Sequence, residues 1–189
     1  MNSSVYIFGN LSKGYTQYPD ENFSAAIFQK FYTKAKATTQ IAIHRDGNLM
    51  YYAYIRALEQ GKYIGLCILL NNVIITKFDG MFSLFENVLS NLVSKGYLIK
   101  FNERGDLVPN SDKLWMNIEE VDLVTESLRA GFDNLQASAE KLPPVNYSTS
   151  SESTKEFSVE DANEEILSSS YNYGYTYIYI NQKISTLPS

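Results

Sequence analysis

The stretch from Gln40 to Phe78 constrains the fold most, because its pattern predicts four consecutive β-strands joined by short turns. It is rich in β-branched and aromatic residues, which favour strands, and turn-forming residues interrupt it at short intervals. Asp46-Gly47 predicts the first turn, a two-residue type I′ loop, since Gly accepts a positive φ and Asp tolerates one. Arg45 and Asn48 are then expected to close this hairpin as a pair.

This turn predicts the register of the hairpin and the side chains on each face of the sheet. Counting back from the turn, Ile43 is expected to face Met50. In the same register Ile41 faces Tyr52, on the same side of the sheet. The other side is predicted to carry His44, Leu49, Tyr51 and Ala53.

Asn71-Asn72 predicts a second hairpin turn, because both residues can enter the left-handed region. The arms of this hairpin would be Ile64–Leu70 and Val73–Ile75. The first arm is apolar throughout, which is typical of a central strand covered on both faces. Cys67, the only cysteine, lies within it, so we expect an unreactive core thiol, no intrachain disulfide and no cysteine-based zinc site.

Before these strands, Ser4–Phe8 predicts a short strand, and LSKGYTQYPD (residues 11–20) predicts a polar and aromatic loop. A helix is expected from Asp20 to about Lys36. Its stripe of apolar residues, spaced by four, would cover one face of the sheet. The stripe consists of Phe23, Ile27 and Phe31.

After the strands, Asp79 is expected to cap a helix that Gly96 ends. Its apolar positions follow the 3.6-residue period. They are Met81, Phe82, Phe85, Val88, Leu89 and Leu92. Tyr97–Phe101 and Asp106–Pro109 then predict a small hairpin or an extension of the sheet edge.

The last third predicts a helix from about Asp112 to Lys141, ended by Pro143-Pro144. One side carries Leu114, Ile118, Val121, Leu128, Phe132 and Leu135. The acidic side is interpreted as solvated surface. A helix from Ser158 and a strand over Tyr173–Ile180 are expected next, and alternation would separate Tyr175, Tyr177 and Tyr179 from Thr176, Ile178 and Ile180.

The predicted fold class is α+β, with an antiparallel sheet of five to six strands and helices on both faces. We divide the chain into a core domain (1–142), a linker (143–157) rich in Ser and Thr, and a helix-strand arm (158–189). The arm is expected to return to an edge of the core sheet, because a strand so apolar would aggregate if it stayed unpaired.

Charge and length narrow the classes of partner. The 189 residues are enough for one domain, and the net charge is -5. Residues 1–109 carry +3 and residues 110–189 carry -8, without the dense basic patch that nucleic-acid binding requires. No apolar run reaches the roughly 18 residues of a membrane span, and the N-terminus lacks a signal-peptide pattern. We therefore expect a cytoplasmic location.

Familiar catalytic and metal-binding motifs do not occur in the sequence. Gly9–Gly14 resembles a phosphate-binding loop, but Tyr15 stands where the motif needs Lys. A single His and a single Cys make a nucleophile pair or a His-rich metal site improbable. We therefore expect no enzyme activity, no catalytic residue, no cofactor and no metal.

One set of residues is a candidate interaction patch, since Tyr and Arg combine large contact area with polar tips. It consists of Tyr15, Tyr18, His44, Arg45, Tyr52, Tyr54 and Arg56. In the alternative interpretation, the tyrosines only cover the sheet beneath a helix, and His44 bonds to backbone or solvent near its turn.

Two resemblances bear on function. The order strand, helix, four strands, helix over residues 4–95 resembles the profilin-like regulatory domains (longin and roadblock) and, more distantly, the PAS and GAF sensors. The phrases YIFGN, YTQYPD, IAIHRDGNLMYYAYIR, KLPPVNY and FSVEDANEEI resemble an N-terminal region of uncharacterised bacterial proteins. The first resemblance implies a regulatory or protein-interaction module, with a protein partner or self-association. The second implies no known activity and indicates a part of a larger bacterial protein or system. A PAS/GAF-like sensor of a small molecule is the alternative.

Overall fold

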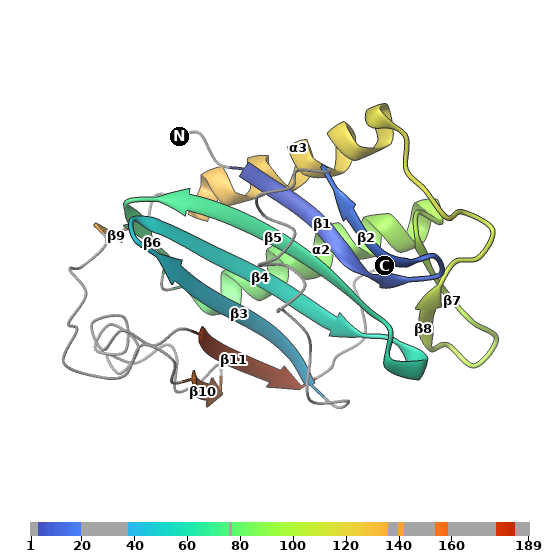
Figure 1. The fold of residues 1–189 in the computed structure, drawn as a ribbon, viewed down its shortest axis with the longest axis horizontal. Helices are drawn as coiled ribbons and strands as arrows, with labels where there is room; N and C mark the ends of the chain where they lie inside the picture. The colour runs from blue at the N-terminus through green and yellow to red at the C-terminus, as the bar shows by residue number, and fades with distance from the viewer. Residues whose placement is uncertain are drawn as a thin grey trace.

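The computed structural model describes residues 4–19, 38–75, 77–135, 140–141, 154–158 and 177–183. They form an α+β fold around a seven-stranded sheet in the order β10-β11-β3-β4-β5-β1-β2 (Figure 1). The six strands from β11 to β2 run antiparallel to their neighbours, as predicted, and β10 runs parallel to β11. The strands are β1 (Ser4–Leu11), β2 (Gly14–Tyr18), β3 (Thr38–Asp46), β4 (Leu49–Ala57), β5 (Tyr63–Asn71), β10 (Thr154–Ser158) and β11 (Tyr177–Lys183).

The hairpin of β3 and β4 turns one residue later than predicted. Asp46 pairs with Leu49, so the central residues of the turn are Gly47 and Asn48. Only Gly47 has a positive φ, 59°, as the first central position of a type II′ turn requires. The predicted Asp-Gly turn is therefore wrong, because Gly takes the position where a side chain would be strained.

The later turn changes the pairing but not the faces. Ile43 pairs with Tyr52 and Ile41 with Tyr54, which shifts the predicted register by two residues. Since side chains alternate with a period of two, a shift of two leaves each residue on its predicted side. Ile41, Ile43, Met50 and Tyr52 share one side of the sheet, as predicted, and this side packs in the larger core.

Two strand predictions near the ends of this sheet are corrected. The residues predicted as a loop after β1 form β2, which pairs with β1 from Leu11–Gly14 to Ile7–Tyr18. Beyond β5, Asn72 has a φ of 64° and turns the chain out of the sheet. β6 (Val73–Ile74) therefore pairs with β9 (Glu140–Lys141) and not with β5.

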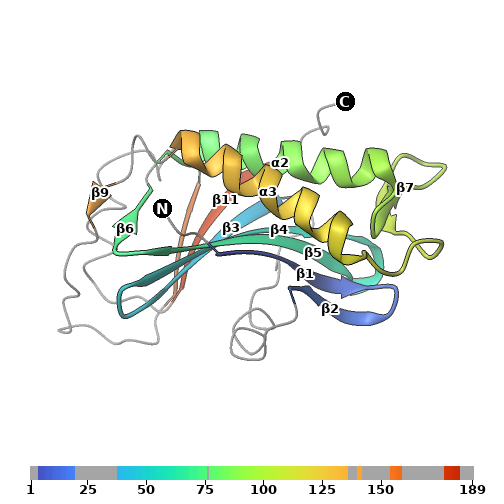
Figure 2. The ribbon, with the colours of Figure 1, turned by 90° about the horizontal axis from the view of Figure 1, so that it is seen from above.

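Both helices of the described residues lie on one face of the sheet (Figure 2). α2 (Phe78–Lys95) has its predicted apolar residues buried, and Gly96 ends it with a φ of 68°. The N-terminal capping position is Lys77 and not Asp79 as predicted, and Asp79 lies in the first turn. α3 (Ile118–Leu135) starts later than predicted, and residues 113–117 before it have no helical structure. No helix in the described part of the chain is long and apolar enough to cross a membrane.

Aromatic rings fill the space between the sheet and the helices. The ring of Tyr54 stacks on Phe85 of α2 at 5.6 Å between centroids. Phe85 in turn meets the edge of Phe132 of α3 at 5.5 Å. All three side chains are fully buried, so this chain of rings joins the sheet to both helices. Beyond α2 lies the predicted hairpin, formed by β7 (Ile99–Phe101) and β8 (Leu107–Pro109).

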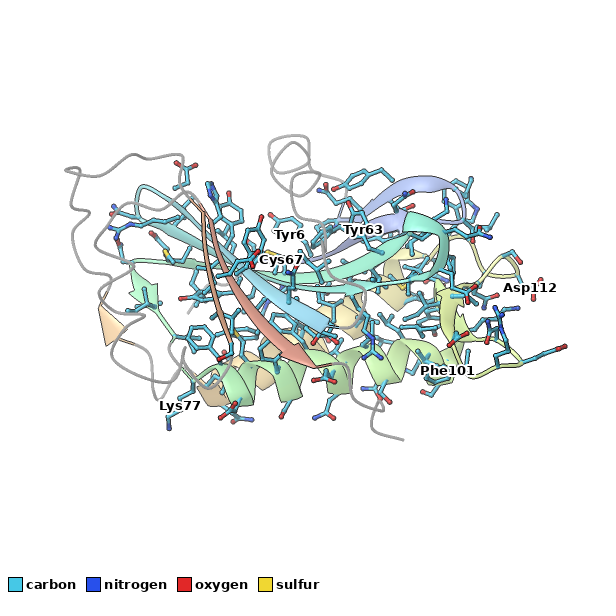
Figure 3. The ribbon with its side chains drawn as sticks, turned by 90° about the horizontal axis from the view of Figure 1, so that it is seen from below. Tyr6, Tyr63, Cys67, Lys77, Phe101 and Asp112 are labelled. Atoms are coloured by element: carbon cyan, nitrogen blue, oxygen red, sulfur yellow. The ribbon has the colours of Figure 1, made fainter. Side chains whose placement is uncertain are left out.

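The opposite face of the sheet has a second, smaller core. Tyr6 and Cys67 pair across β1 and β5 on this face, away from α2 (Figure 3). Burial raises the pKa of the Cys67 thiol well above its ordinary value, in line with the expected inert core thiol. Gly65 leaves room for the ring of Phe8, which a Cβ at that position would overlap.

The C-terminal strand takes the place beside β3. β11 pairs antiparallel with β3, which is the sheet-edge pairing that its alternating pattern indicates. Tyr179 packs in the smaller core and Ile180 in the larger one, so the two residues face opposite sides, as predicted. Residues 154–158, predicted as the end of the linker and the start of a helix, form β10. The predicted helix from Asp20 to Lys36, the two prolines at 143–144 and the rest of the helix from Ser158 lie outside the described residues.

Candidate functional site

The structure does not bring the residues of the predicted interaction patch together. Tyr52 and Tyr54 are fully buried and face the helices, and Arg56 is nearly buried on the same side of β4. Their place beneath α2 matches the alternative interpretation, in which the tyrosines cover the sheet under a helix. These three residues therefore contribute nothing to an exposed surface.

A buried polar group surrounds the hydroxyl of Tyr54. Thr39, Arg56 and Glu86 are all nearly buried, and each influences this hydroxyl. Burial is the main cause that raises the pKa of Tyr54 to about 12, and the positive charge of Arg56 partly opposes it. Arg56 and Thr39 lie within hydrogen-bonding reach of the Tyr54 hydroxyl and also oppose the rise in its pKa, but neither contact has the geometry of a well-formed hydrogen bond, and Nη1 of Arg56 makes none. The hydrogen bonds of this buried cluster are therefore incomplete.

His44 and Arg45 lie near the β3–β4 turn. The ring of His44 lies 5.7 Å from that of Tyr51, its partner across the strand pair. Nε of Arg45 donates a hydrogen bond to the carbonyl oxygen of Gly47 at 3.1 Å. Since side chains alternate along a strand, His44 faces the side of the sheet opposite to Tyr52, whereas Arg45 lies on the same side as Tyr52. The sheet therefore separates His44 from the other strand residues of the predicted patch.

Tyr15 and Tyr18 lie on β2, at the edge of the sheet. The hydroxyl of Tyr15 donates to Oε1 of Gln17 at 2.9 Å. The hydroxyl of Tyr18 accepts a hydrogen bond from the backbone N–H of Met116 at 3.1 Å. This last contact joins the sheet edge to the segment that leads into α3, 98 residues later in the chain.

That segment carries the most exposed apolar side chains of the described residues. Trp115 is 60% exposed and Ile118, the first residue of α3, is 80% exposed. Nζ of Lys13, in the β1–β2 turn, lies 3.0 Å from the centroid of the Trp115 ring, a cation–π contact. We call Lys13, Trp115 and Ile118 the Trp115 surface.

The backbone around the Trp115 surface is held from several sides. Asn117 and Glu120 form a capping box: Oδ1 of Asn117 accepts from the Glu120 N–H at 2.8 Å, and Oε1 of Glu120 accepts from the Asn117 N–H at 3.0 Å. Lys113 adds an ion pair to the same carboxylate at 2.9 Å. The Asn117 N–H, followed by Lys113, lowers the pKa of Glu120. The side chain of Met116, between these residues, is buried.

These contacts make the Trp115 surface a preorganised structure. Its backbone has fixed partners on β2 and at the start of α3, while its apolar side chains point to solvent. Sequence reasoning assigned Ile118 to a buried helix face and gave Trp115 no role. The available signal was the pattern Asn-x-x-Glu at residues 117–120, a capping box that predicts a helix start at Ile118 and not near Asp112.

Comparison of this chain with protein families, curated proteins and solved structures gives no match. Within the described residues, no three His, Cys, Asp or Glu side chains come together as a metal ion would require. Among the described residues, we take two features as candidate functional sites: the Trp115 surface and the buried cluster around Tyr54.

Proposed function

We propose that this chain is a non-enzymatic protein-interaction module of the cytosol, which contacts its partner through the Trp115 surface. The observation that carries the proposal is the exposed indole of Trp115 beside the exposed Ile118. Trp is the residue type most enriched at the energetic centres of protein interfaces, because its ring buries a large area and keeps a polar N–H.

The support around Trp115 strengthens this proposal. Association loses affinity when loops and side chains must be ordered on binding. The hydrogen bond from Met116 to Tyr18 and the capping box at Asn117 order this backbone before any partner arrives. The cation–π contact with Lys13 favours one position of the indole. Less conformational entropy is then lost when the indole is buried.

A small-molecule sensor is the second candidate function, and the buried cluster around Tyr54 favours it. A ligand that accepts hydrogen bonds would satisfy Nη1 of Arg56 and the Tyr54 hydroxyl. The stacked rings of Tyr54 and Phe85 beside the cluster fill the adjacent space, which favours the interaction module over the sensor. A regulatory role within a larger bacterial system stays part of the proposal, on the resemblances described above.

A site-specific crosslinking experiment tests the proposed function. A photoreactive residue at Ile118 should capture a protein partner in the native host, and the same residue at Phe101, which is 45% exposed, serves as the matched position. The captured partner is then purified, and its affinity is measured for Trp115→Ala and Phe101→Ala. We expect Trp115→Ala to weaken binding by about 2 kcal/mol, roughly 30-fold. We expect Phe101→Ala to have almost no effect.

The proposal fails if the affinity is the same for Trp115→Ala, Ile118→Asp and the unchanged protein. A thermal melt of each variant checks that the fold persists. Both residues are exposed, so their substitution should leave the melting temperature nearly unchanged.

A further inference from the structure

We infer that the partner presents a basic segment with an apolar anchor residue. The anchor packs on Trp115 and Ile118, and the lysine or arginine side chains lie along the exposed face of α3. This inference rests on the proposed function and adds the charge of the partner.

The exposed face of α3 is strongly acidic. Residues 112–135 contain six acidic and two basic residues, a net charge of -4. Four of the acids are exposed and follow one another at spacings of three, four and seven residues, which places them along one stripe of the helix. They are Glu119, Asp122, Glu126 and Asp133.

The helix dipole does not account for this stripe. Acidic residues stabilise the first turn of a helix, which explains Glu119. Glu126 lies in the middle of α3, and Asp133 lies in its last turn, where the dipole favours positive charge. The last turn of α3 carries no basic residue. Glu119, Asp122 and Glu126 therefore repel one another at spacings of three and four residues, and positive charge from a partner would relieve this repulsion.

Internal ion pairs do not neutralise the stripe. Among the described residues, the ion pairs near α3 join Lys113 to Glu120 and Lys100 to Asp112. None of the four acids of the stripe takes part in the ion pairs that the described residues form. Arg129, three residues after Glu126 and four before Asp133 on the same helix, reduces the negative charge at that end of the stripe, so the negative charge that faces the solvent and a partner is greatest at Glu119 and Asp122.

The apolar and acidic features share one exposed surface. Ile118 and Leu123 are 80% and 56% exposed, and both lie beside the acidic stripe on α3. A partner that buries Trp115 and Ile118 must therefore also lie close to Glu119 and Asp122. Charge complementarity selects a basic partner, because like charges brought together at an interface oppose binding. The same charge disfavours an anionic lipid surface or a nucleic acid.

The intrinsic fluorescence of Trp115 provides a direct assay, because the chain has only one tryptophan. The probes are two short synthetic peptides with the same leucine anchor positions, one with lysine and one with glutamate at the polar positions. We expect the lysine peptide to shift the emission of Trp115 to shorter wavelength and to protect it from acrylamide. Its affinity should exceed that of the glutamate peptide by about ten-fold and fall as salt is added.

A matched pair of charge reversals tests the role of the stripe. Glu126→Lys should weaken binding of the lysine peptide several-fold, and Glu103→Lys, an exposed acid in the β7–β8 turn, should leave it unchanged. Circular dichroism checks that both variants stay folded. Vesicles of phosphatidylcholine with phosphatidylserine form the third arm of the experiment, and we expect no change in Trp115 emission with them.

The outcomes separate the inference from the proposed function. Equal affinity for both peptides, or equal effects of the two charge reversals, overturns the basic partner but leaves the Trp115 surface as an interaction site. A response to the vesicles and to neither peptide overturns the inference in favour of a lipid surface. A response to neither peptide and no vesicle effect also overturns it, whereas the proposed function is decided only by the affinity of the partner captured at Ile118 for Trp115→Ala and Ile118→Asp.

Discussion

Replacement of Phe85 by alanine should destabilise the fold strongly. Phe85 is fully buried, and truncation of such a side chain costs about 3 to 5 kcal/mol, including the cavity that is left. Its ring also stacks on Tyr54 and meets the edge of Phe132. Each aromatic pair adds about 0.5 to 1.5 kcal/mol beyond burial, so we expect the upper part of the range, about 5 kcal/mol.

Urea unfolding followed by far-UV circular dichroism measures this loss. With a slope of about 2 to 3 kcal/mol per molar urea, the midpoint should fall by roughly 2 M. Phe101→Ala is the matched control, because it removes the same side chain from a position that is 45% exposed, and it should cost below about 1 kcal/mol. If the two substitutions cost the same, the ring contacts do not join the sheet to α2 and α3, and the described core is wrong.

Three further predictions concern the sheet. Gly9→Ala should cost about 1 to 3 kcal/mol in urea unfolding, because the new Cβ would overlap the carbonyl oxygen of Tyr63 on β5; an unchanged midpoint contradicts the β1–β5 pairing. Cys67 should react with a thiol reagent only at the rate of unfolding, since it is buried and its pKa is raised; rapid labelling of the native protein contradicts this. The pKa of Tyr54 is about 10 in the unfolded chain and about 12 in the folded protein. The protonated hydroxyl therefore adds about 3 kcal/mol to the free energy of unfolding below pH 10, and this part is lost between about pH 10 and pH 12. Tyr54→Phe should lack this part of the alkaline loss in pH-dependent urea titrations, and equal slopes for both proteins contradict it.

Local sequence patterns predicted much of the fold, because the spacing of apolar residues shows which side of a helix or strand is buried. The apolar period of residues 81–92 predicted the buried face of α2, and Gly96 predicted its end. The alternation in β3 and β4 predicted the two faces correctly although the turn was placed one residue early. The faces depend only on the parity of the register, which this error did not change.

The errors arose where tertiary contacts decide between local alternatives. β2 has few apolar residues, so its sequence is typical of a loop, and pairing with β1 makes it a strand. Val73–Ile74 follow the apolar strand β5 after only two asparagines, which favoured a hairpin with β5, yet they pair with β9, far along the chain. The strand with which each of these two segments pairs cannot be predicted from the residues of a single hairpin.

The candidate site was missed for a related reason. Tyr15 and Tyr18 were predicted as contact residues and do lie on the sheet edge, but the strand residues Tyr52, Tyr54 and Arg56 were predicted beside them and are buried. An interface needs residues that are both apolar and exposed, and exposure is a property of the packed fold. The alternation of β4 indicated two faces but not which of them a helix covers, and the alternative interpretation, with these tyrosines beneath a helix, matches their place under α2.

The Trp115 surface is built by contacts between segments that are distant in the chain. Lys13 lies over the indole of Trp115, and the Tyr18 hydroxyl holds the N–H of Met116, so the β1–β2 hairpin supports a segment about 100 residues later. The capping box at Asn117 starts α3 directly after Trp115 and Met116, and the exposed Ile118 in its first turn lies next to Glu119, the first acid of the stripe. Taken alone, an acidic helix face indicates solvated surface, and a single exposed aromatic residue indicates little. Their juxtaposition at one sheet edge, on a backbone ordered in advance, is what favours a basic partner over plain solvent.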